Sequence, residues 1–364
     1  MRRIFLVIGL GSAGSAIVTA FIFYNLQLAR VASLAPMREV QTESSEPSPT
    51  NIGTVASMAA AESQPSIIIF AVGDIMLGRN VEGWMIKEGL DYPFRKVNEF
   101  FKSADLAIGN LEGPIRKKHT RTPTGSTTFN FKSEVAAELK NAGVGALSLS
   151  NNHTFDYGPQ AFEETKSYLR QAGIDFFGHP HDIHDDYVLR KEIGGQKFAF
   201  IGLQDVFASM DSKKAVALIK RVAAEPNTTT IVSIHWGDEY KPIANQRQKT
   251  LAREFIDAGA DVVIGHHPHV VQNVELYKGR PIFYSLGNFI FDQYFSKETQ
   301  EGLAIGLEFK GASLRIRLYP VDIIKSQPVL MEDFRAREWL KALSSRSEKA
   351  LSEPIREGII VTSL

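Results

Sequence analysis

Short apolar runs alternate with segments of helical character between residues 66 and 264, and this alternation limits the folds open to the chain. Buried strands appear as short apolar runs that end at turn residues, whereas longer amphipathic segments indicate helices. Alternation at this spacing predicts right-handed crossovers and a mainly parallel sheet covered by helices. The predicted strands cover residues 66–72, 105–108, 144–149, 198–203, 229–234 and 261–264, and the predicted helices cover residues 133–142, 159–172, 212–224 and 246–258.

The pattern changes after residue 265, where strand-like runs continue without helices between them. We expect these later strands to form an antiparallel sheet that packs on the parallel one. A charged surface helix is predicted at residues 331–350. The later predicted strands cover residues 270–277, 281–284, 303–309 and 314–323.

Six segments of the chain end an apolar run with a side chain that can bind a cation or transfer a proton. In an α/β sheet, the carboxyl ends of the strands face one crevice, so side chains placed there converge even when they are far apart in sequence. The set combines carboxylates, carboxamides and imidazoles, which suits divalent transition metals. The metal ligands predicted from these segments are Asp74, Glu112, Asn152, His235, His267 and His269.

The oxygen ligands come from three of these segments. Asp74 directly follows a buried run, where a carboxylate is costly unless it is paired or coordinated; alternatively, it caps the next helix. Glu112 lies in a loop flanked by glycine and can bridge two cations, while Asn152 offers a carbonyl oxygen.

The nitrogen ligands come from a histidine cluster and one further histidine. His267 and His269 flank Pro268, which stiffens the turn, and two imidazoles at this spacing can serve neighbouring cations. His266 is expected to point elsewhere, because adjacent residues of an extended chain face opposite sides. His235 is the predicted third imidazole. The competing hypothesis is purely structural, with these histidines satisfied inside a core.

His153 is the candidate for acid–base chemistry, with Asp156 three residues further on. A hydrogen bond from one ring nitrogen to Asp156 would fix the tautomer of the imidazole. The alternative is that Asp156 caps the helix that follows it.

Two further residues are predicted to contact substrate. Arg79 lies close to Asp74, where a guanidinium suits an anionic substrate, although it could equally pair with a structural carboxylate. Asn288 is expected to form part of the site wall. The remaining histidines lie in polar segments and are predicted to be on the surface: His119, His179, His181 and His184.

Composition narrows the functional classes. The 364 residues carry 41 basic and 41 acidic side chains, so the basic bias that nucleic-acid binding needs is absent. The chain has no cysteine, which excludes disulfides, thiolate nucleophiles and cysteine zinc sites.

The first residues predict a membrane anchor. Arg2 and Arg3 precede an apolar stretch at residues 4–28, which is long enough to span a bilayer and would direct the remaining chain out of the cytoplasm. A signal peptide cleaved near Ala35 and a buried core helix are the alternatives. We therefore divide the chain into an anchor (1–29), a flexible linker (30–65), a main domain (66–325) and a C-terminal helical appendage (326–364).

Six motifs in the same order resemble the CapA-type poly-γ-glutamate capsule biosynthesis proteins, which are similar to the calcineurin-like metallophosphoesterases. The resemblance covers roughly residues 67–324. The motifs are Gly73-Asp74-Ile-Met-Leu-Gly-Arg79, Asn110-Leu-Glu112-Gly-Pro114, Asn151-Asn-His153 with Asp156-Tyr-Gly158, His235-Trp-Gly237, His267-Pro-His269-Val and Ser285-Leu-Gly-Asn-Phe289.

This resemblance implies a fold and a ligand set. The fold is an α/β four-layer sandwich, in which two mixed β-sheets pack together between helices. Asp74 and His269 would bind a first cation, Glu112 would bridge, and Asn152, His235 and His267 would bind the second. His153 would protonate the leaving group.

Two positions depart from the usual phosphoesterase pattern. The phosphoesterases open with Asp-x-His, whereas Met76 stands at the position of that histidine, so a first-cation ligand is missing or replaced. Glu112 stands where an aspartate is usual.

Together, these features predict a bacterial protein anchored by one membrane span, with its domain outside the cytoplasm and two divalent cations (Mn, Fe, Zn or Ni) in its site. The substrate would be a phosphoester or an amide of a γ-linked glutamate polymer, and other capsule synthase subunits are expected partners. The alternatives are a non-catalytic subunit that uses the site to hold an anionic polymer, or a phosphoesterase with an unrelated substrate.

Overall fold

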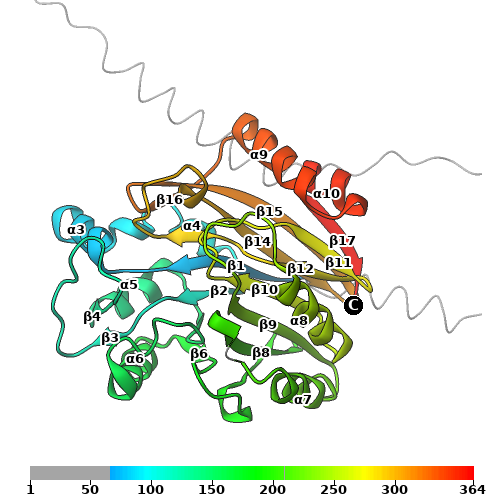
Figure 1. Cartoon of the computed structure of the whole chain (residues 1–364), viewed down its shortest axis with the longest axis horizontal. Coiled ribbons are helices and arrows are strands. Elements are labelled where there is room, and N and C mark those ends of the chain that lie inside the picture. The colour runs from blue at the N-terminus through cyan, green and yellow to red at the C-terminus, as the bar shows by residue number, and fades with distance from the viewer. Residues whose placement is uncertain (1–65, 209) are drawn as a thin grey trace, which may run out of the picture. The chain divides into compact units, whose positions relative to one another are not determined.

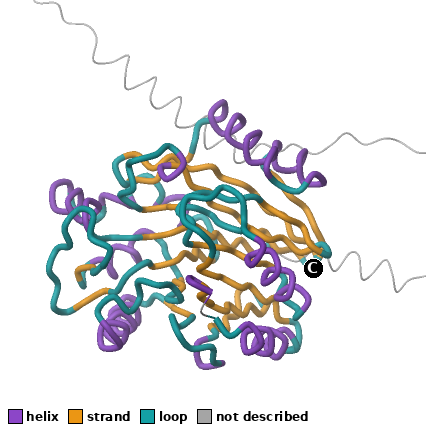
Figure 2. The backbone as a smooth tube through the Cα atoms, in the orientation of Figure 1, coloured by secondary structure: helices purple, strands orange, loops and turns teal. Residues whose placement is uncertain are grey.

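The computed structural model describes residues 66–208 and 210–364, in which helices surround a central body of strands (Figures 1 and 2). The predicted anchor (1–29) and linker (30–65) lie outside these residues. Within the described ranges, no helix combines the length and the apolar character needed to cross a bilayer.

The first sheet is mixed and has the strand order β16-β15-β14-β1-β2-β5-β6, with β13 added beside β1 and β17 beside β15. Strands β1, β2, β5 and β6 are parallel, whereas β14 runs antiparallel to β1. The strands of this sheet are β1 (Ile67–Ile75), β2 (Leu106–Leu111), β5 (Ala146–Ser148), β6 (Asp175–Phe177), β13 (Asn288–Ile290), β14 (Glu301–Lys310), β15 (Ser313–Ile324), β16 (Gln327–Leu330) and β17 (Ile359–Ser363).

The second sheet is also mixed and has the order β11-β12-β10-β9-β8-β7. Its four inner strands are parallel, and the two edge strands are antiparallel to their neighbours. Its strands are β7 (Leu189–Ile193), β8 (Gln196–Asp205), β9 (Thr228–Trp236), β10 (Val262–His266), β11 (Val274–Tyr277) and β12 (Arg280–Phe283); β3 (Ile115–Arg116) and β4 (Phe131–Lys132) form a separate short pair.

Helices cover the outer faces of both sheets (Figure 1). Helix α8 begins with a capping box formed by Asn245 and Gln248, which satisfies two free backbone N–H groups. The α-helices are α3 (Arg79–Glu88), α4 (Asn98–Lys102), α5 (Val135–Ala142), α6 (Gly158–Ala172), α7 (Ser212–Ala223), α8 (Gln246–Asp257), α9 (Asp333–Arg346) and α10 (Ser352–Glu357). Short 3-10 helices lie at Tyr92–Phe94, Asp185–Tyr187, Val206–Ala208, Glu298–Gln300 and Lys349–Leu351.

Each sheet has a hydrophobic core on both faces, because side chains alternate along a buried strand. In β1, Ile69 lies in the core between the sheets, whereas Phe70 lies in the core beneath α3 to α6. In β9, Ile231 belongs to the inter-sheet core, and Val232 packs beneath α7 and α8. The two sheets therefore lie face to face with helices outside them.

The later strands do not form a separate antiparallel sheet, and that prediction was wrong. Strand β14 pairs with β1 from Ile67 to Ala71 and so extends the first sheet edge to edge. Apolar runs specify buried strands, but they do not specify which neighbour completes the backbone pairing.

The C-terminal residues contribute more than a surface helix. Helix α9 falls inside the predicted segment, and its Leu340 and Leu343 are buried in the inter-sheet core. Strands β16 and β17 both pair with β15, so the chain after residue 326 completes one side of the first sheet.

Candidate metal centre

The predicted site residues stand in register at the carboxyl ends of neighbouring strands. In the first sheet, Asp74 lies opposite both Asn110 of β2 and Asn288 of β13. In the second sheet, His235 of β9 lies opposite His266 of β10. The two sets meet where Asn110 Nδ2 lies 3.2 Å from His235 Nδ1, so the site spans the adjoining edges of both sheets.

Asp74 is the most heavily bonded member of the group and is fully buried. Its Oδ1 accepts a hydrogen bond of 2.9 Å from Asn110 Nδ2, and its Oδ2 accepts one of 3.2 Å from the backbone N–H of His267. Burial opposes ionisation of Asp74, but the surrounding imidazoles of His266, His269 and His235 together outweigh it and hold the pKa of Asp74 well below its usual range. Asp74 is therefore a carboxylate whose lone pairs already face imidazoles.

His266 does not point away from the site, contrary to the prediction. Its Nδ1 lies 3.3 Å from Asp74 Oδ1, and only 3% of its surface is exposed. The turn that follows β10 is the reason, because the left-handed backbone of His267 (φ 94°) breaks the extended geometry assumed for this segment.

Glu112 and Asn152 carry buried oxygen atoms that have no hydrogen-bond partner among the described residues. Both carboxylate oxygens of Glu112 are in this state, as is Oδ1 of Asn152. Burial raises the pKa of Glu112 to about 7. Buried polar atoms in proteins are almost always satisfied, so these three oxygens are candidate ligand atoms for a cation.

His235 and His267 present ring nitrogens to each other. Nε2 of His235 lies 3.1 Å from Nδ1 of His267, and both side chains are almost fully buried. Burial, reinforced by the neighbouring His267, lowers the pKa of His235 well below its ordinary value, and burial lowers the pKa of His267 to about 4. Both rings are therefore neutral near pH 7, which is the state that binds a metal.

His269 is held in a different electrostatic environment. Its Nδ1 lies 3.0 Å from Asn288 Oδ1, and its Nε2 lies 3.7 Å from Glu112 Oε1. Although burial opposes the charged ring, the carboxylates of Glu112 and Asp74 raise the pKa of His269 to about 9. In the absence of a cation, a protonated His269 therefore balances charge at the site.

Asn288 contacts the His269 ring and lies in the wall of the site. It is fully buried, and its amide group donates to Gln293 Oε1 at 3.0 Å and to the carbonyl of Thr299 at 2.9 Å. The amide hydrogens and the oxygen of Asn288 therefore make hydrogen bonds within the protein, and its contact with a substrate stays a prediction.

His153 and Asp156 have the geometry predicted for them. Nδ1 of His153 lies 2.9 Å from Asp156 Oδ2, and Nε2 lies 3.8 Å from Glu112 Oε1. Asp156 does not cap α6, whose N-cap Tyr157 makes no side-chain capping bond. The ring packs against Phe129 at 4.1 Å between ring centroids, so His153 is oriented with Nε2 toward the other candidate ligands.

Arg79 pairs with a structural carboxylate, the second of its two predicted roles. Its guanidinium bonds to Asp292 and to the carbonyl of Ser126, and it stacks over Phe129 and Phe291. The side chain is 12% exposed. Arg79 therefore supports the aromatic rings that pack against His153 and His269.

His119 is another residue whose predicted position differs from the observed one. It lies 2.8 Å from the buried Glu82 and 2.6 Å from Asn130, with 12% of its side chain exposed. These contacts hold the His119 side chain against the protein. The polar residues around it in the sequence therefore did not mean that the side chain is on the surface.

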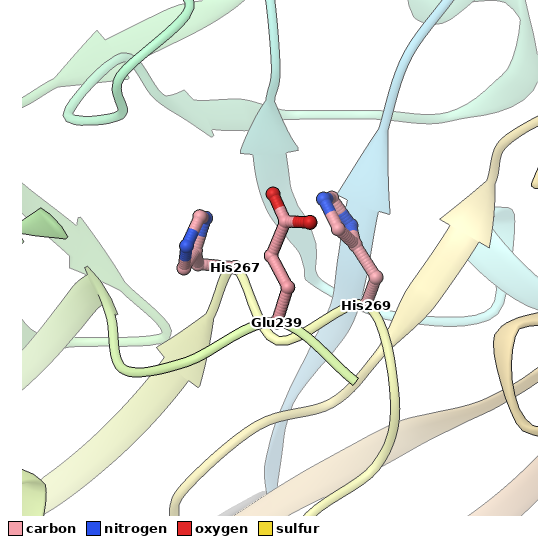
Figure 3. A group of neighbouring side chains, drawn as sticks. All are labelled: Glu239, His267 and His269. Atoms are coloured by element: carbon pink, nitrogen blue, oxygen red, sulfur yellow. The ribbon is translucent and has the colours of Figure 1, made fainter. Parts of the chain in front are cut away.

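Met76 and Glu239 change the composition of the ligand set. Met76 is fully buried in the core beneath the helices, where its sulfur accepts a hydrogen bond from the backbone N–H of Gly78. Glu239, which sequence reasoning missed, forms a group with His267 and His269 in which the ligand atoms lie within 4.8 Å of one another (Figure 3). A second group joins Asp74, Glu112 and His235 within the same limit.

The site fits a divalent cation. Carboxylate, amide and neutral imidazole atoms converge in two adjoining groups, and the unpartnered oxygens of Glu112 and Asn152 lie among them. The division into Asp74–Glu112–His235 and Glu239–His267–His269 differs from the one that the resemblance implied. A cavity of about 370 Å³ adjoins the site and is lined by Asn152, His267, Glu239 and the Asp205–Arg247 ion pair, among others.

Comparisons with known proteins are consistent with one another. The family model for the bacterial capsule synthesis protein PGA_cap matches residues 68–293. Capsule biosynthesis protein CapA of Bacillus anthracis is 33% identical over 278 residues, covering 71% of this chain and 67% of that protein. PGA biosynthesis protein CapA of Bacillus subtilis (strain 168) is 33% identical over 272 residues, covering 71% and 72%.

Among solved structures, a hypothetical protein from Thermus thermophilus aligns with a TM-score of 0.43 at 18% identity, covering 72% of this chain and 96% of that one. Similarity at this level supports no conclusion about function.

Proposed function

Because the chain belongs to the bacterial capsule synthesis protein family, we propose that it acts in the synthesis or export of a capsule polymer of the poly-γ-glutamate type. In this proposal, it carries a hydrolase-like site for two divalent cations at the adjoining ends of its sheets. The fold would be a four-layer sandwich of the metallophosphoesterase type. Residues 1–29 would anchor the protein in the bacterial membrane, with the domain outside the cytoplasm.

One observation supports the cation site more than any other. Glu112 is fully buried, and neither of its oxygens has a hydrogen-bond partner among the described residues. His269 and His153 lie within ion-pair distance of Glu112 Oε1 but do not hydrogen-bond to it. A buried carboxylate without hydrogen bonds is costly, and a bound cation would offset that cost. Asp74, Glu112, Asn152, His235, His267 and His269 would hold the cations.

The protein's own residues supply the remaining chemistry. When bound, divalent cations of such a site lower the pKa of a water and stabilise negative charge on the scissile group. His153 would hold a proton at Nε2 and deliver it to the departing atom, while Asp156 keeps Nδ1 in hydrogen-bond contact and thereby sets the ring orientation. Asn110 would orient Asp74 from beneath the site.

A second candidate function is a polymer-binding subunit without catalysis, and Met76 favours it. Met76 stands where the usual phosphoesterase pattern has a histidine. Its side chain packs in the core, and its sulfur accepts a hydrogen bond from the backbone N–H of Gly78. A site with fewer cation ligands could still hold an anionic polymer through its cations.

The experiment that separates the candidates uses the purified full-length chain loaded with Mn²⁺ or Zn²⁺. A generic phosphodiester and a γ-glutamyl polymer serve as substrates, and His153→Ala is compared with the exposed control His184→Ala. Turnover that only His153→Ala abolishes, with bound metal retained, supports catalysis. Metal-dependent polymer binding without turnover supports the subunit, and a chain that binds no metal contradicts both.

A further inference from the structure

Glu239 occupies a position that neither the sequence motifs nor the family match assigns to a function. Its carboxylate lies between the His267 and His269 rings, and all three side chains point the same way (Figure 3). Glu239 is exposed, whereas both histidines are buried, so the carboxylate closes the solvent side of the group. Glu239 also raises the pKa of Glu112, which places its charge close to the other candidate ligands.

The loop that carries Glu239 is held against the histidine turn. The backbone N–H of Tyr240 donates to the carbonyl of Pro268 at 2.8 Å. Three non-glycine residues here have left-handed backbones: Tyr240 (φ 60°), His267 (φ 94°) and His269 (φ 57°). Each such residue costs about 1–2 kcal/mol, and strain of this kind concentrates at functional sites.

A chain of side-chain contacts links Glu239 to His269 behind the site. Asn288 contacts His269 Nδ1 and donates to Gln293, whose amide donates to Tyr240 Oη at 3.2 Å. Burial and the adjacent Glu239 carboxylate raise the pKa of Tyr240, so this hydroxyl lies near the carboxylate. The hydrogen bonds that begin at His269 therefore end beside Glu239, and outer residues of this kind orient the inner ones in metal sites.

We propose that Glu239 is a cation ligand, which binds together with His267 and His269. This inference rests on the proposed cation site. It adds a third carboxylate beside Asp74 and Glu112, and an oxygen-rich ligand set favours Mn²⁺ over softer cations. Tyr240 acts as a positioning residue that holds the Glu239 carboxylate toward the two imidazoles.

The test measures Mn²⁺ binding to the full-length chain by electron paramagnetic resonance titration, which reports free ion directly. Glu239→Gln keeps the size of the side chain and removes its charge. It should weaken Mn²⁺ affinity by at least about 10-fold, since even outer-shell changes cost metal sites about 10–100-fold. Tyr240→Phe should weaken affinity less than Glu239→Gln does.

Asp238→Asn is the matched control, because it removes the same charge from the adjacent residue, which belongs to neither ligand group. It should leave affinity unchanged, and thermal melting in EDTA should be the same for all variants. If the wild type binds Mn²⁺ and Glu239→Gln binds it with the same affinity, this inference is overturned while the proposed cation site stands. If Asp238→Asn and Glu239→Gln weaken Mn²⁺ affinity equally, Glu239 acts only through its charge, and the proposal that it is a ligand is also overturned. A wild-type chain that binds no Mn²⁺ would overturn the proposed cation site as well.

Discussion

Replacing Glu112 with glutamine should stabilise the metal-free protein and weaken its stabilisation by metal. Burial raises the pKa of Glu112 to about 7 in the folded chain, against an ordinary value of 4.5. Above pH 7, Glu112 is ionised in both the folded and the unfolded chain. Ionisation costs more free energy in the folded chain, because the pKa of Glu112 is higher there. The difference corresponds to about 3 kcal/mol at roughly 1.36 kcal/mol per pKa unit.

The sign of the pH dependence follows from linkage. A carboxyl group with a raised folded pKa destabilises the fold at high pH, and this cost disappears as the pH falls toward the unfolded pKa. Metal-free Glu112→Gln should therefore exceed wild type in free energy of unfolding by about 3 kcal/mol at about pH 8, and by less than about 1 kcal/mol at about pH 5. His269 contributes to the same balance, because its Nε2 lies 3.7 Å from Glu112 Oε1.

The assay is thermal melting followed by circular dichroism, in EDTA and then in excess Mn²⁺. In a domain of this size, about 3 kcal/mol corresponds to roughly 6 °C in Tm. Metal at about 100 times the wild-type Kd should add about 2.7 kcal/mol to wild type and clearly less to the variant, which has lost one carboxylate of the site. Glu99→Gln is the control, since its side chain is 83% exposed. A metal-free Glu112→Gln variant that melts at or below wild type at pH 8 would refute the reasoning.

Three further substitutions test other parts of the structure. His153→Ala should lower turnover by about 10²–10⁴-fold on whichever substrate is found, while elemental analysis shows the metal retained; loss of the metal instead would make His153 a ligand. Arg79→Ala should lower the free energy of unfolding by about 3–5 kcal/mol in urea, because it leaves the buried Asp292 unpaired; an unchanged free energy of unfolding would mean that the pair is not structural. Gly73→Ala should yield no soluble folded protein, because the added Cβ would lie 1.9 Å from the carbonyl oxygen of Gly287; a normal melting curve would show that this close approach does not exist.

The strand ends were predictable because two signals coincide there. Continuous apolar runs identify buried strands, and the change to glycine and polar residues identifies their carboxyl ends, as at Gly73-Asp74 and Gly265-His266. Parallel strands place those ends along one edge of each sheet, so the approach of Asp74 to Asn110 follows from topology. No contact between individual side chains had to be known. The approach of His235 to Asn110 joins the two sheets and depends on how they pack.

The remaining features depend on contacts that leave no local pattern. Helix α3 was not predicted, because it is only ten residues long, contains a glycine and has Gly78 as its N-cap, which offers no side-chain cap. Glu239 reaches the site only because the Tyr240 backbone bonds to Pro268, and the pairing of Arg79 with Asp292 joins residues 213 positions apart. The motif His235-Trp236-Gly237 ends two residues before Glu239, and no local pattern in the sequence marks Glu239 as a ligand.

Anomalous diffraction from a crystal of the Mn²⁺-loaded protein would test the central claim most directly. It should show cation peaks within about 2.0–2.3 Å of carboxylate oxygens and imidazole nitrogens from Asp74, Glu112, His235, His267 and His269, the usual bond lengths for such ligands. Strong peaks located only elsewhere on the protein, with Glu112 still without a partner, would contradict it.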